Sequence, residues 1–190
     1  MSKKVLVLLA NGFEEVEAVT PIDYLRRAGI TVVTAALGPS KTVTGARGIP
    51  VAADVSLEEA GGTAAYDAVL IPGGMPGATN LAASAAVGAL IKDFAAADKW
   101  VCAICASPAV VLAPLGLLRD RRFTCYPGAE KGLTEGKWSA EAVVVDGKIV
   151  TSRAAGTAAL WALTIIRHLL GEQDAAKVAA SVLLEPGKLP

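Results

Sequence analysis

Cys105 lies between the apolar run Trp100–Ile104 and the apolar segment Val110–Leu112. This pattern is typical of a strand that ends in a sharp turn, with a nucleophile in the turn and a helix just after it. A helix N-terminus carries partial positive charge and free backbone N–H groups, so it favours the thiolate over the thiol. Because the thiolate is the reactive form, we predict that Cys105 is a nucleophile with a lowered pKa.

The other two cysteines fit this chemistry less well. Cys102 has C-x-x-C spacing with Cys105, but it lies inside the predicted strand, and we interpret it as a core residue. Cys125 is open to two interpretations, a packing role or a resolving thiol that forms a disulfide with oxidised Cys105. Three cysteines without framework spacing fit a reducing compartment, so we expect a cytoplasmic protein.

A cysteine nucleophile needs a group that moves protons, and the chain has one histidine, His168. It falls far along the predicted helix Gly156–Leu170, on what reads as the solvent edge. Most enzymes that pair cysteine with histidine are therefore excluded. The proton partner is expected to be a carboxyl group.

Three glutamates, Glu14, Glu15 and Glu17, follow the first apolar run. Acids at a helix start usually interact with the helix dipole or with solvent, and we interpret Glu14 and Glu15 in this way. Glu17 is one turn further along and can point back over the sheet edge. Beside a thiolate and away from water its pKa would rise, so we predict that Glu17 is the general acid and base.

The glycine pair Gly73-Gly74 follows the apolar run Ala68–Ile71. Glycine permits unusual dihedral angles and close backbone approach, and an ordinary tight turn is the alternative reading. If the pair faces Cys105, the N–H groups of Gly74 and Ala106 would form an oxyanion hole.

Apolar runs alternate with helical segments along the chain. Strands are predicted at Val5–Ala10, Ile30–Ala35, Ala68–Ile71, Trp100–Ile104, Phe123–Cys125, Ala142–Val145 and Ile149–Thr151, with a hairpin-like excursion at Thr42–Ala53. Helices are predicted up to Gly29 and at Thr79–Leu81, Ser84–Ala96, Gly156–Leu170 and Asp174–Leu183. The first helix has an N-cap signal at Thr20-Pro21. Glu14–Val19 is then either a preceding turn or the proline-kinked first part of the same helix.

This alternation predicts an α/β fold, with a mainly parallel sheet between two layers of helices. The length of 190 residues fits a single domain over residues 1–190. Ligands of such sheets bind beyond the carboxyl ends of the strands. The topology therefore brings Asn11–Glu17, Gly73-Gly74 and Cys105-Ala106 to one rim.

Charge and hydropathy exclude several classes. Lysine plus arginine (18) equals aspartate plus glutamate (18), which is unlike the basic footprint of a nucleic-acid binder. The run Val5–Ala10 after two lysines is too short for a signal peptide and leads into glutamates rather than a cleavage site. The uncharged stretch Trp100–Leu118 is interrupted by Pro108 and Pro114, so we expect no membrane span.

Five segments together resemble the DJ/ThiJ/PfpI superfamily and, within it, the DJ branch named for the Parkinsonism-associated protein: Asn11–Glu17, Arg26–Ile30, Ile71–Gly74, Ala103–Ala106 and Thr151–Thr157. The resemblance covers essentially the whole chain in order. It implies a flavodoxin-like three-layer sandwich and a homodimer. We expect no cofactor and no metal.

The resemblance also assigns residues. The reactive cysteine of the family falls on Cys105 and its protonated glutamate on Glu17, and the oxyanion-hole amides fall on Gly74 and Ala106, as read above from the pattern. The arginine that approaches an anion matches Arg47, and Arg27 is a weaker match.

The chain departs from the family pattern at two places. Many members of the DJ branch have a histidine where this chain has Tyr126, in Thr124–Pro127. A phenol can hydrogen-bond to a substrate but is a poor base at neutral pH, which leaves the Cys105–Glu17 pair. Peptidase-like relatives have histidine directly after the cysteine, and Ala106 at that position argues against proteolysis.

The resemblance implies a cysteine-dependent glyoxalase or deglycase that acts on methylglyoxal-type dicarbonyls or their glycated adducts and protects against oxidative and carbonyl stress. The alternative is a redox sensor or chaperone in which Cys105 is oxidised to a sulfinate. The sequence leaves both open.

Overall fold

The structure, a computed structural model, describes residues 3–184. Its main strands are β1 (Lys4–Leu9), β2 (Thr31–Ala36), β5 (Val55–Ser56), β6 (Ala68–Ile71), β7 (Trp100–Ile104), β10 (Val143–Asp146) and β11 (Ile149–Ser152). They form one seven-stranded sheet in the order β10-β11-β7-β6-β1-β2-β5. Neighbouring strands are parallel except for β10 and β11, which form an antiparallel hairpin. The expected mainly parallel sheet is confirmed.

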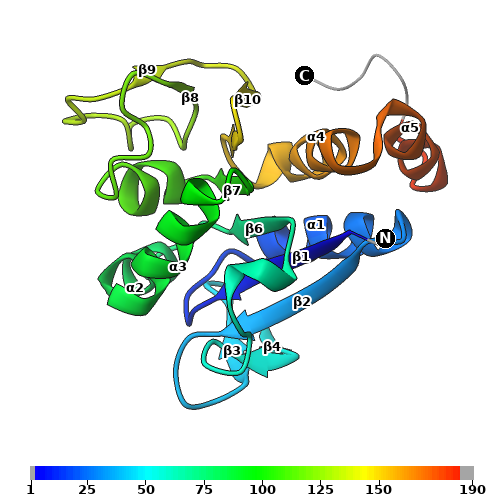
Figure 1. Cartoon of the computed structure of the whole chain (residues 1–190), viewed down its shortest axis with the longest axis horizontal. Helices are drawn as coiled ribbons and strands as arrows, with labels where there is room; N and C mark the ends of the chain where they lie inside the picture. Colours follow the sequence, from blue (N-terminus) through cyan, green and yellow to red (C-terminus); the bar gives the residue numbers. More distant parts are fainter. Residues whose placement is uncertain (1–2, 185–190) are drawn as a thin grey trace.

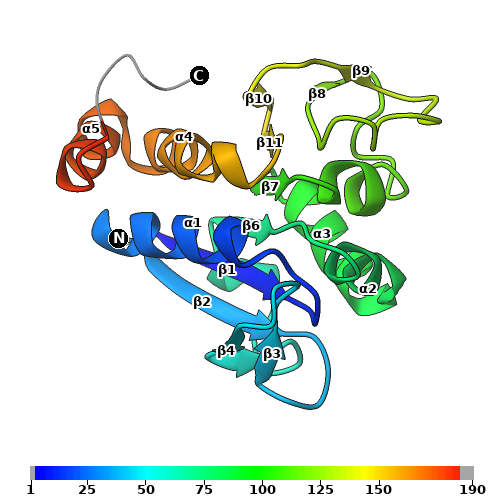
Figure 2. The same cartoon turned by 180° about the vertical axis from the view of Figure 1, so that it is seen from behind.

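Helices cover both faces of the sheet (Figures 1 and 2). One face carries α1 (Glu15–Arg27), α4 (Ala158–Leu170) and α5 (Glu172–Ser181), and the other carries α2 (Gly77–Ala83), α3 (Ala85–Ala96) and a π-helical segment at Pro108–Leu112. Alternate residues of β1 supply both cores, because successive side chains of a strand point to opposite faces. Val5, Val7 and Leu9 pack with α1 and α4, whereas Leu6 and Leu8 pack with α3. No helix within residues 3–184 is long and apolar enough to cross a membrane.

The first helix begins earlier than the Thr20-Pro21 signal indicates. Glu14 has an extended backbone and precedes the first helical residue, and α1 continues through Pro21 to Arg27. Thr20 is therefore not a helix start, and Glu14–Val19 belongs to the same helix. This matters for the site, because it places Glu17 in the first turn of α1.

The short strands fall in two further sheets. β3 (Thr42–Thr44) and β4 (Pro50–Ala52) form the expected hairpin. β8 (Arg122–Phe123) pairs with β9 (Lys137–Trp138), so the prediction that Phe123–Cys125 completes the main sheet is wrong. The N–H of Thr124 donates to the side-chain hydroxyl of Thr151 at 2.9 Å rather than to a backbone carbonyl of the sheet, so this segment does not continue the ladder. Two 3₁₀ turns, at Thr63–Ala65 and Ala155–Thr157, complete the described structure.

The chain order across the sheet reverses beside β1. One neighbour is β2, reached through α1, and the other is β6, which is reached only after β5. Crevices at such reversals, beyond the carboxyl ends of the strands, are the usual ligand sites of doubly wound folds. The carboxyl ends of β1, β6 and β7 meet there.

Candidate functional site

Cys105 lies in a sharp turn at the end of β7. Its φ of 64° is in the left-handed region, which residues other than glycine rarely adopt. Two backbone hydrogen bonds hold it there: its N–H donates to the carbonyl of Ser152 at 2.9 Å, and its own carbonyl accepts from the N–H of Tyr126 at 2.8 Å. The Ser107 hydroxyl fastens the turn to β6 by donating to the carbonyl of Pro72 at 2.6 Å. The predicted strand and turn are confirmed.

The helix predicted after Cys105 is present and short. It is a π-helical segment over Pro108–Leu112, in which the N–H of Ala113 donates to the carbonyl of Pro108 at 3.0 Å. Proline residues at 108 and 114 limit its length. A helix this short has few aligned peptide dipoles with which to favour the thiolate.

Glu17 is the charged group nearest to Cys105, and it is buried, with 1% of its surface exposed. Its Oε2 accepts from the N–H of Gly73 at 2.9 Å, and the carboxyl group also hydrogen-bonds to Cys105 and to the N–H of Ala155. Burial, together with the charge of Glu14, raises the pKa of Glu17 to about 7, although the hydrogen bonds act to lower it. A proton is therefore available on this carboxyl group near neutral pH.

The thiol and the carboxyl group titrate as a pair. While Glu17 is ionised, burial and the negative charge of Glu17 raise the pKa of Cys105 to about 12, and the N–H groups of Gly74 and Ala106, which hydrogen-bond to the thiol, lower it. The sequence expectation of a thiol pKa lowered by a helix N-terminus is thus wrong. Protonation of Glu17 removes the opposing charge, and the two N–H groups that face sulfur then favour the thiolate.

Gly73 is a site residue that the sequence interpretation missed, because it assigned a role only to Gly74. A Cβ on Gly73 would lie 2.5 Å from the Cβ of Cys105 and 2.6 Å from the Oε2 of Glu17. Such separations are well inside van der Waals contact, so only glycine permits the two side chains to meet here. The signal was present in the sequence, since both glycines follow the end of a buried strand.

A cavity of about 420 Å³ opens above the Cys105–Glu17 pair. Its size falls in the range of small-molecule sites. It brings together six of the residues singled out from the sequence: Cys105, Glu17, Gly74, Ala106, Arg47 and Tyr126. The remaining lining residues are Glu14, Ala46, Met75, Ala154 and Ala155.

Glu15 lies at the start of α1, as expected, but it is not in contact with bulk solvent. It is buried, and its Oε1 accepts from the N–H groups of Arg47 at 2.7 Å and Ile49 at 3.3 Å. Burial acts to raise its pKa, but hydrogen bonds from backbone N–H groups, its own included, outweigh burial and the pKa is lowered. Glu15 therefore fixes the turn that carries Arg47 over the cavity. Glu14, at the N-cap, and Glu15, in the first turn of α1, fit the helix-dipole interpretation, but Glu15 is buried rather than solvated. Glu14 lines the cavity and lies 3.9 Å from the Arg47 guanidinium.

Two predicted residues lie outside the cavity. Arg27 ends α1, about 15 Å along the helix axis from Glu17, and pairs with Asp23 at 2.7 Å. It is not part of the site. Cys125 is fully buried on the opposite face of the sheet from Glu17, in the core that contains α3, and its thiol faces Glu130 at 4.0 Å. This position favours the packing role over the resolving thiol.

His168 and Cys102 agree with the sequence interpretation. The His168 ring stacks on Trp100, with centroids 4.6 Å apart, at the amino end of β7. Cys102 is fully buried within β7, in the core beneath α4. All three cysteines of the described residues are free thiols.

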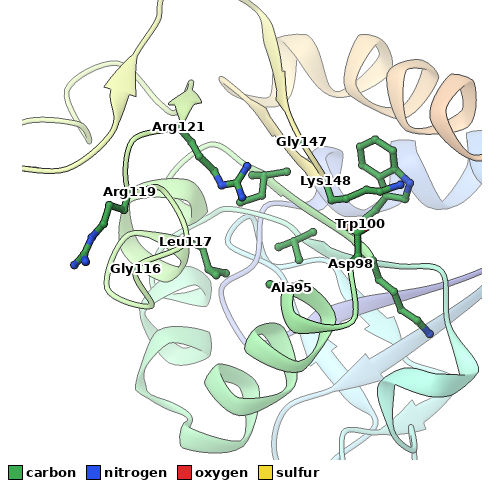
Figure 3. A pocket seen from close by; sticks show the side chains of 12 residues that line it. Ala95, Asp98, Trp100, Gly116, Leu117, Arg119, Arg121, Gly147 and Lys148 are labelled. Atoms are coloured by element: carbon green, nitrogen blue, oxygen red, sulfur yellow. The ribbon is translucent and has the colours of Figure 1, made fainter.

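A second cavity, of about 490 Å³, lies at the opposite end of the strands (Figure 3). Arg121 points toward it and Arg119 points away. Its cations already have partners: Arg121 pairs with Asp146 at 3.2 Å, and the Lys148 ammonium lies 4.5 Å from the centroid of Trp100. This cavity contains none of the residues singled out from the sequence.

Comparisons with known proteins agree with this fold. The model of the DJ-1/PfpI family matches residues 3–168. The Parkinson disease protein 7 homolog of Danio rerio is 41% identical over 186 residues, which are 96% of this chain and 98% of that protein. The crystal structure of Drosophila melanogaster DJ-1beta superimposes with a TM-score of 0.92 at 36% identity, and the match covers 98% of this chain and all of the other.

A third relative carries a name that describes an activity. The glutathione-independent glyoxalase DJR-1.2 of Caenorhabditis elegans is 35% identical, over 90% of this chain and 91% of its own length. The fold is therefore the flavodoxin-like sandwich of these relatives, and the family model covers most of the described chain. The chain belongs to the DJ-1/PfpI family and, within it, to the DJ-1 branch.

Proposed function

We propose that this protein is a cysteine-dependent glyoxalase or deglycase that converts methylglyoxal-type dicarbonyls or their amine adducts to hydroxy acids. The observation that carries the proposal is the contact of Cys105 with the buried carboxyl group of Glu17, at the base of a cavity, beside two backbone N–H donors. The nematode relative named as a glutathione-independent glyoxalase supports it. An enzyme without glutathione needs a thiol of its own.

The first step is addition of the Cys105 thiolate to the aldehyde carbon. A C–S bond forms, the carbonyl π electrons move to oxygen, and the N–H groups of Gly74 and Ala106 stabilise the resulting oxyanion. Protonated Glu17 then gives its proton to that oxygen. The product is a hemithioacetal, and Glu17 is left as a carboxylate.

In the second step the former aldehyde carbon is oxidised and the neighbouring ketone carbon is reduced. The Glu17 carboxylate removes the proton from the former aldehyde carbon, and the electron pair moves into an enediol. Return of a proton to the neighbouring carbon gives a thioester of lactate. Water adds to this thioester and the thiol leaves, so methylglyoxal plus one water becomes lactate with no external oxidant or reductant. In a hemiaminal adduct of a protein or nucleotide amine the C–N bond breaks first, the amine leaves with a proton, and the aldehyde so regenerated follows the same course.

The test is lactate formation from methylglyoxal by the wild type, Cys105→Ser and Glu17→Gln. We expect turnover to vanish in Cys105→Ser and to fall by about 10²–10⁴ in Glu17→Gln, the range for loss of a general acid and base. Alkylation of Cys105 by iodoacetamide should persist in Glu17→Gln, because the amide leaves no negative charge beside sulfur. Wild-type turnover no greater than that of Cys105→Ser would reject the proposal.

A redox sensor is the second candidate, because the same donors suit an oxidised sulfur. Two molecules of peroxide would convert the thiolate to a sulfinate and two waters. The N–H groups of Gly74 and Ala106 and the protonated Glu17 would then hydrogen-bond to the sulfinate. Intact mass after mild peroxide should show two added oxygens on Cys105, and none if this candidate fails.

We also propose that the protein is a cytoplasmic homodimer that protects against carbonyl and oxidative stress, a setting in which a chaperone role is compatible with the sensor. Proteolysis is not proposed, because Ala106 stands where a peptidase-type member needs histidine. The oligomeric state is measured directly by sedimentation. A mass of one chain at micromolar concentration would reject the dimer.

A further inference from the structure

Two large apolar side chains border the cavity above Cys105 and remain in contact with solvent. Met75 is 57% exposed and Tyr126 is 53% exposed. Both are tied closely to the reacting group: Met75 follows Gly74, whose N–H faces sulfur, and the N–H of Tyr126 donates to the Cys105 carbonyl. Their backbones are thus fixed relative to the thiol. An exposed apolar pair beside a nucleophile is a surface that a bound ligand can cover.

The rest of the wall is small and apolar, formed by Ala46, Ala106, Ala154 and Ala155. The charged lining residues beyond Glu17 are Glu14 and Arg47, which have opposite signs and lie 3.9 Å apart. Their charges largely compensate each other. The lining therefore favours a neutral, apolar substituent over an anionic or a cationic one.

The volume of the cavity also favours a substrate with a large apolar substituent. A dicarbonyl as small as methylglyoxal fills little of the 420 Å³ cavity and leaves Met75 and Tyr126 in water. A planar aromatic substituent on the dicarbonyl would contact both side chains, because the Met75 sulfur and the Tyr126 ring each pack favourably against an aromatic ring. The Tyr126 ring makes this contact larger than an imidazole would.

We propose that the Cys105 site prefers 2-oxoaldehydes that carry an aromatic substituent, and that Tyr126 and Met75 determine this specificity. The preference rests on the proposed function, whose site it describes. Tyr126 acts through its ring and not through its hydroxyl. The chemistry at the aldehyde carbon is the same for both classes of substrate.

The test compares kcat/KM for phenylglyoxal and methylglyoxal, from initial rates at concentrations where intact mass shows no arginine modification. The wild type should favour phenylglyoxal by about tenfold, the order expected for one well-packed aromatic contact. Tyr126→Ala and Met75→Ala should bring the ratio toward one. Tyr126→Phe should retain the wild-type ratio. Leu183→Ala, a control at a side chain that is 88% exposed, should retain it as well.

A ratio that is unchanged in Tyr126→Ala and Met75→Ala would overturn the inference. A ratio lost in Tyr126→Phe would overturn it too, because the hydroxyl and not the ring would then be responsible. If the ratio fell only because exposed apolar surface had been removed, Leu183→Ala would lower it as much as Tyr126→Ala and Met75→Ala do.

A second measurement separates this inference from the proposed function. Alkylation of Cys105 by phenacyl chloride and by chloroacetone, each normalised to its rate with free cysteine, needs no turnover. If neither dicarbonyl is converted but phenacyl chloride is favoured and Tyr126→Ala abolishes the advantage, the enzyme proposal fails and the site preference stands. If both dicarbonyls are converted equally and no alkylation preference exists, the inference fails and the enzyme remains.

Discussion

At the scale of single residues, the chemistry depends on one proton shared by Glu17 and Cys105. Burial raises the pKa of the carboxyl group to about 7 and also opposes the thiolate. The negative charge of either group opposes ionisation of the other, so the proposed reactive combination is a thiolate beside a carboxylic acid. The reactivity of Cys105 therefore depends more on the protonation of Glu17 than on the short helix that follows it.

The raised pKa of Glu17 predicts a pH-dependent stability. Between pH 4.5 and 7 the folded protein holds a proton that the unfolded chain has lost, so the free energy of unfolding falls as pH rises through this window. Glu17→Gln removes the dependence while its carbonyl oxygen still accepts from Gly73. In urea denaturation, the free energy of unfolding of the variant relative to that of the wild type should increase between pH 4.5 and 8, by on the order of 3 kcal/mol at most. The exposed control Glu58→Gln should show no such gain.

Glu15 acts through Arg47, so its loss should affect binding more than chemistry. Glu15→Ala removes the acceptor for the N–H groups of Arg47 and Ile49 and frees the turn beside the cavity. We expect KM for methylglyoxal to rise several-fold, with kcat little changed. Equal falls in kcat and kcat/KM would place Glu15 in the chemical step instead. Glu58→Ala is the surface control.

At the scale of elements, the site is a meeting of three strand ends. β1 leads into α1 and Glu17, β6 ends before Gly73 and Gly74, and β7 ends at Ile104, just before Cys105. The N–H of Glu14 donates to the carbonyl of Gly73 at 2.9 Å, which joins the first two of these connections. A change in one connection therefore moves the others.

Gly73→Ala tests this close approach. The added Cβ would fall on Cys105 and Glu17, so we expect turnover to drop at least about a hundredfold, as on loss of the acid and base. Circular dichroism should show that the sheet persists. Gly62→Ala is the matched control, because its Cβ would meet no atom within 4 Å, and it should retain full activity. Normal turnover in Gly73→Ala would contradict the placement of the pair.

At the scale of the whole molecule, two apolar cores on opposite faces of one sheet hold the strand ends in place. Trp161 of α4 is the largest fully buried side chain, and it belongs to the core that also contains α1. Phe94 of α3 occupies the other core. The position of Glu17 thus depends on how α1 and α4 pack together on the sheet.

Removing this packing should be costly. Trp161→Ala is expected to lower the free energy of unfolding by about 3–5 kcal/mol, the usual cost of truncating a buried aromatic residue. Leu183→Ala, at 88% exposure, should change it by less than about 0.5 kcal/mol. Both values come from urea denaturation at one pH. A cost for Trp161→Ala as small as that of the control would contradict its role in the core.

The sequence by itself determined the alternation of strands and helices. The spacing of apolar residues and the positions of glycine and proline, which indicate these elements, are properties of short stretches of chain. It also determined the rim, since parallel strands deliver their carboxyl ends to one edge. Cys105, Glu17, Gly74 and Ala106 follow from that topology and were placed correctly.

Tertiary structure alone decided the rest, since it depends on contacts between distant segments. It buried Glu15 against the turn that carries Arg47, and excluded Arg27 at the far end of α1. Above all, it buried the predicted Cys105–Glu17 pair, which raises the pKa of both groups. The ionisation of Cys105 was misjudged from sequence because burial and a neighbouring charge outweigh one short helical turn, and neither can be read from local pattern.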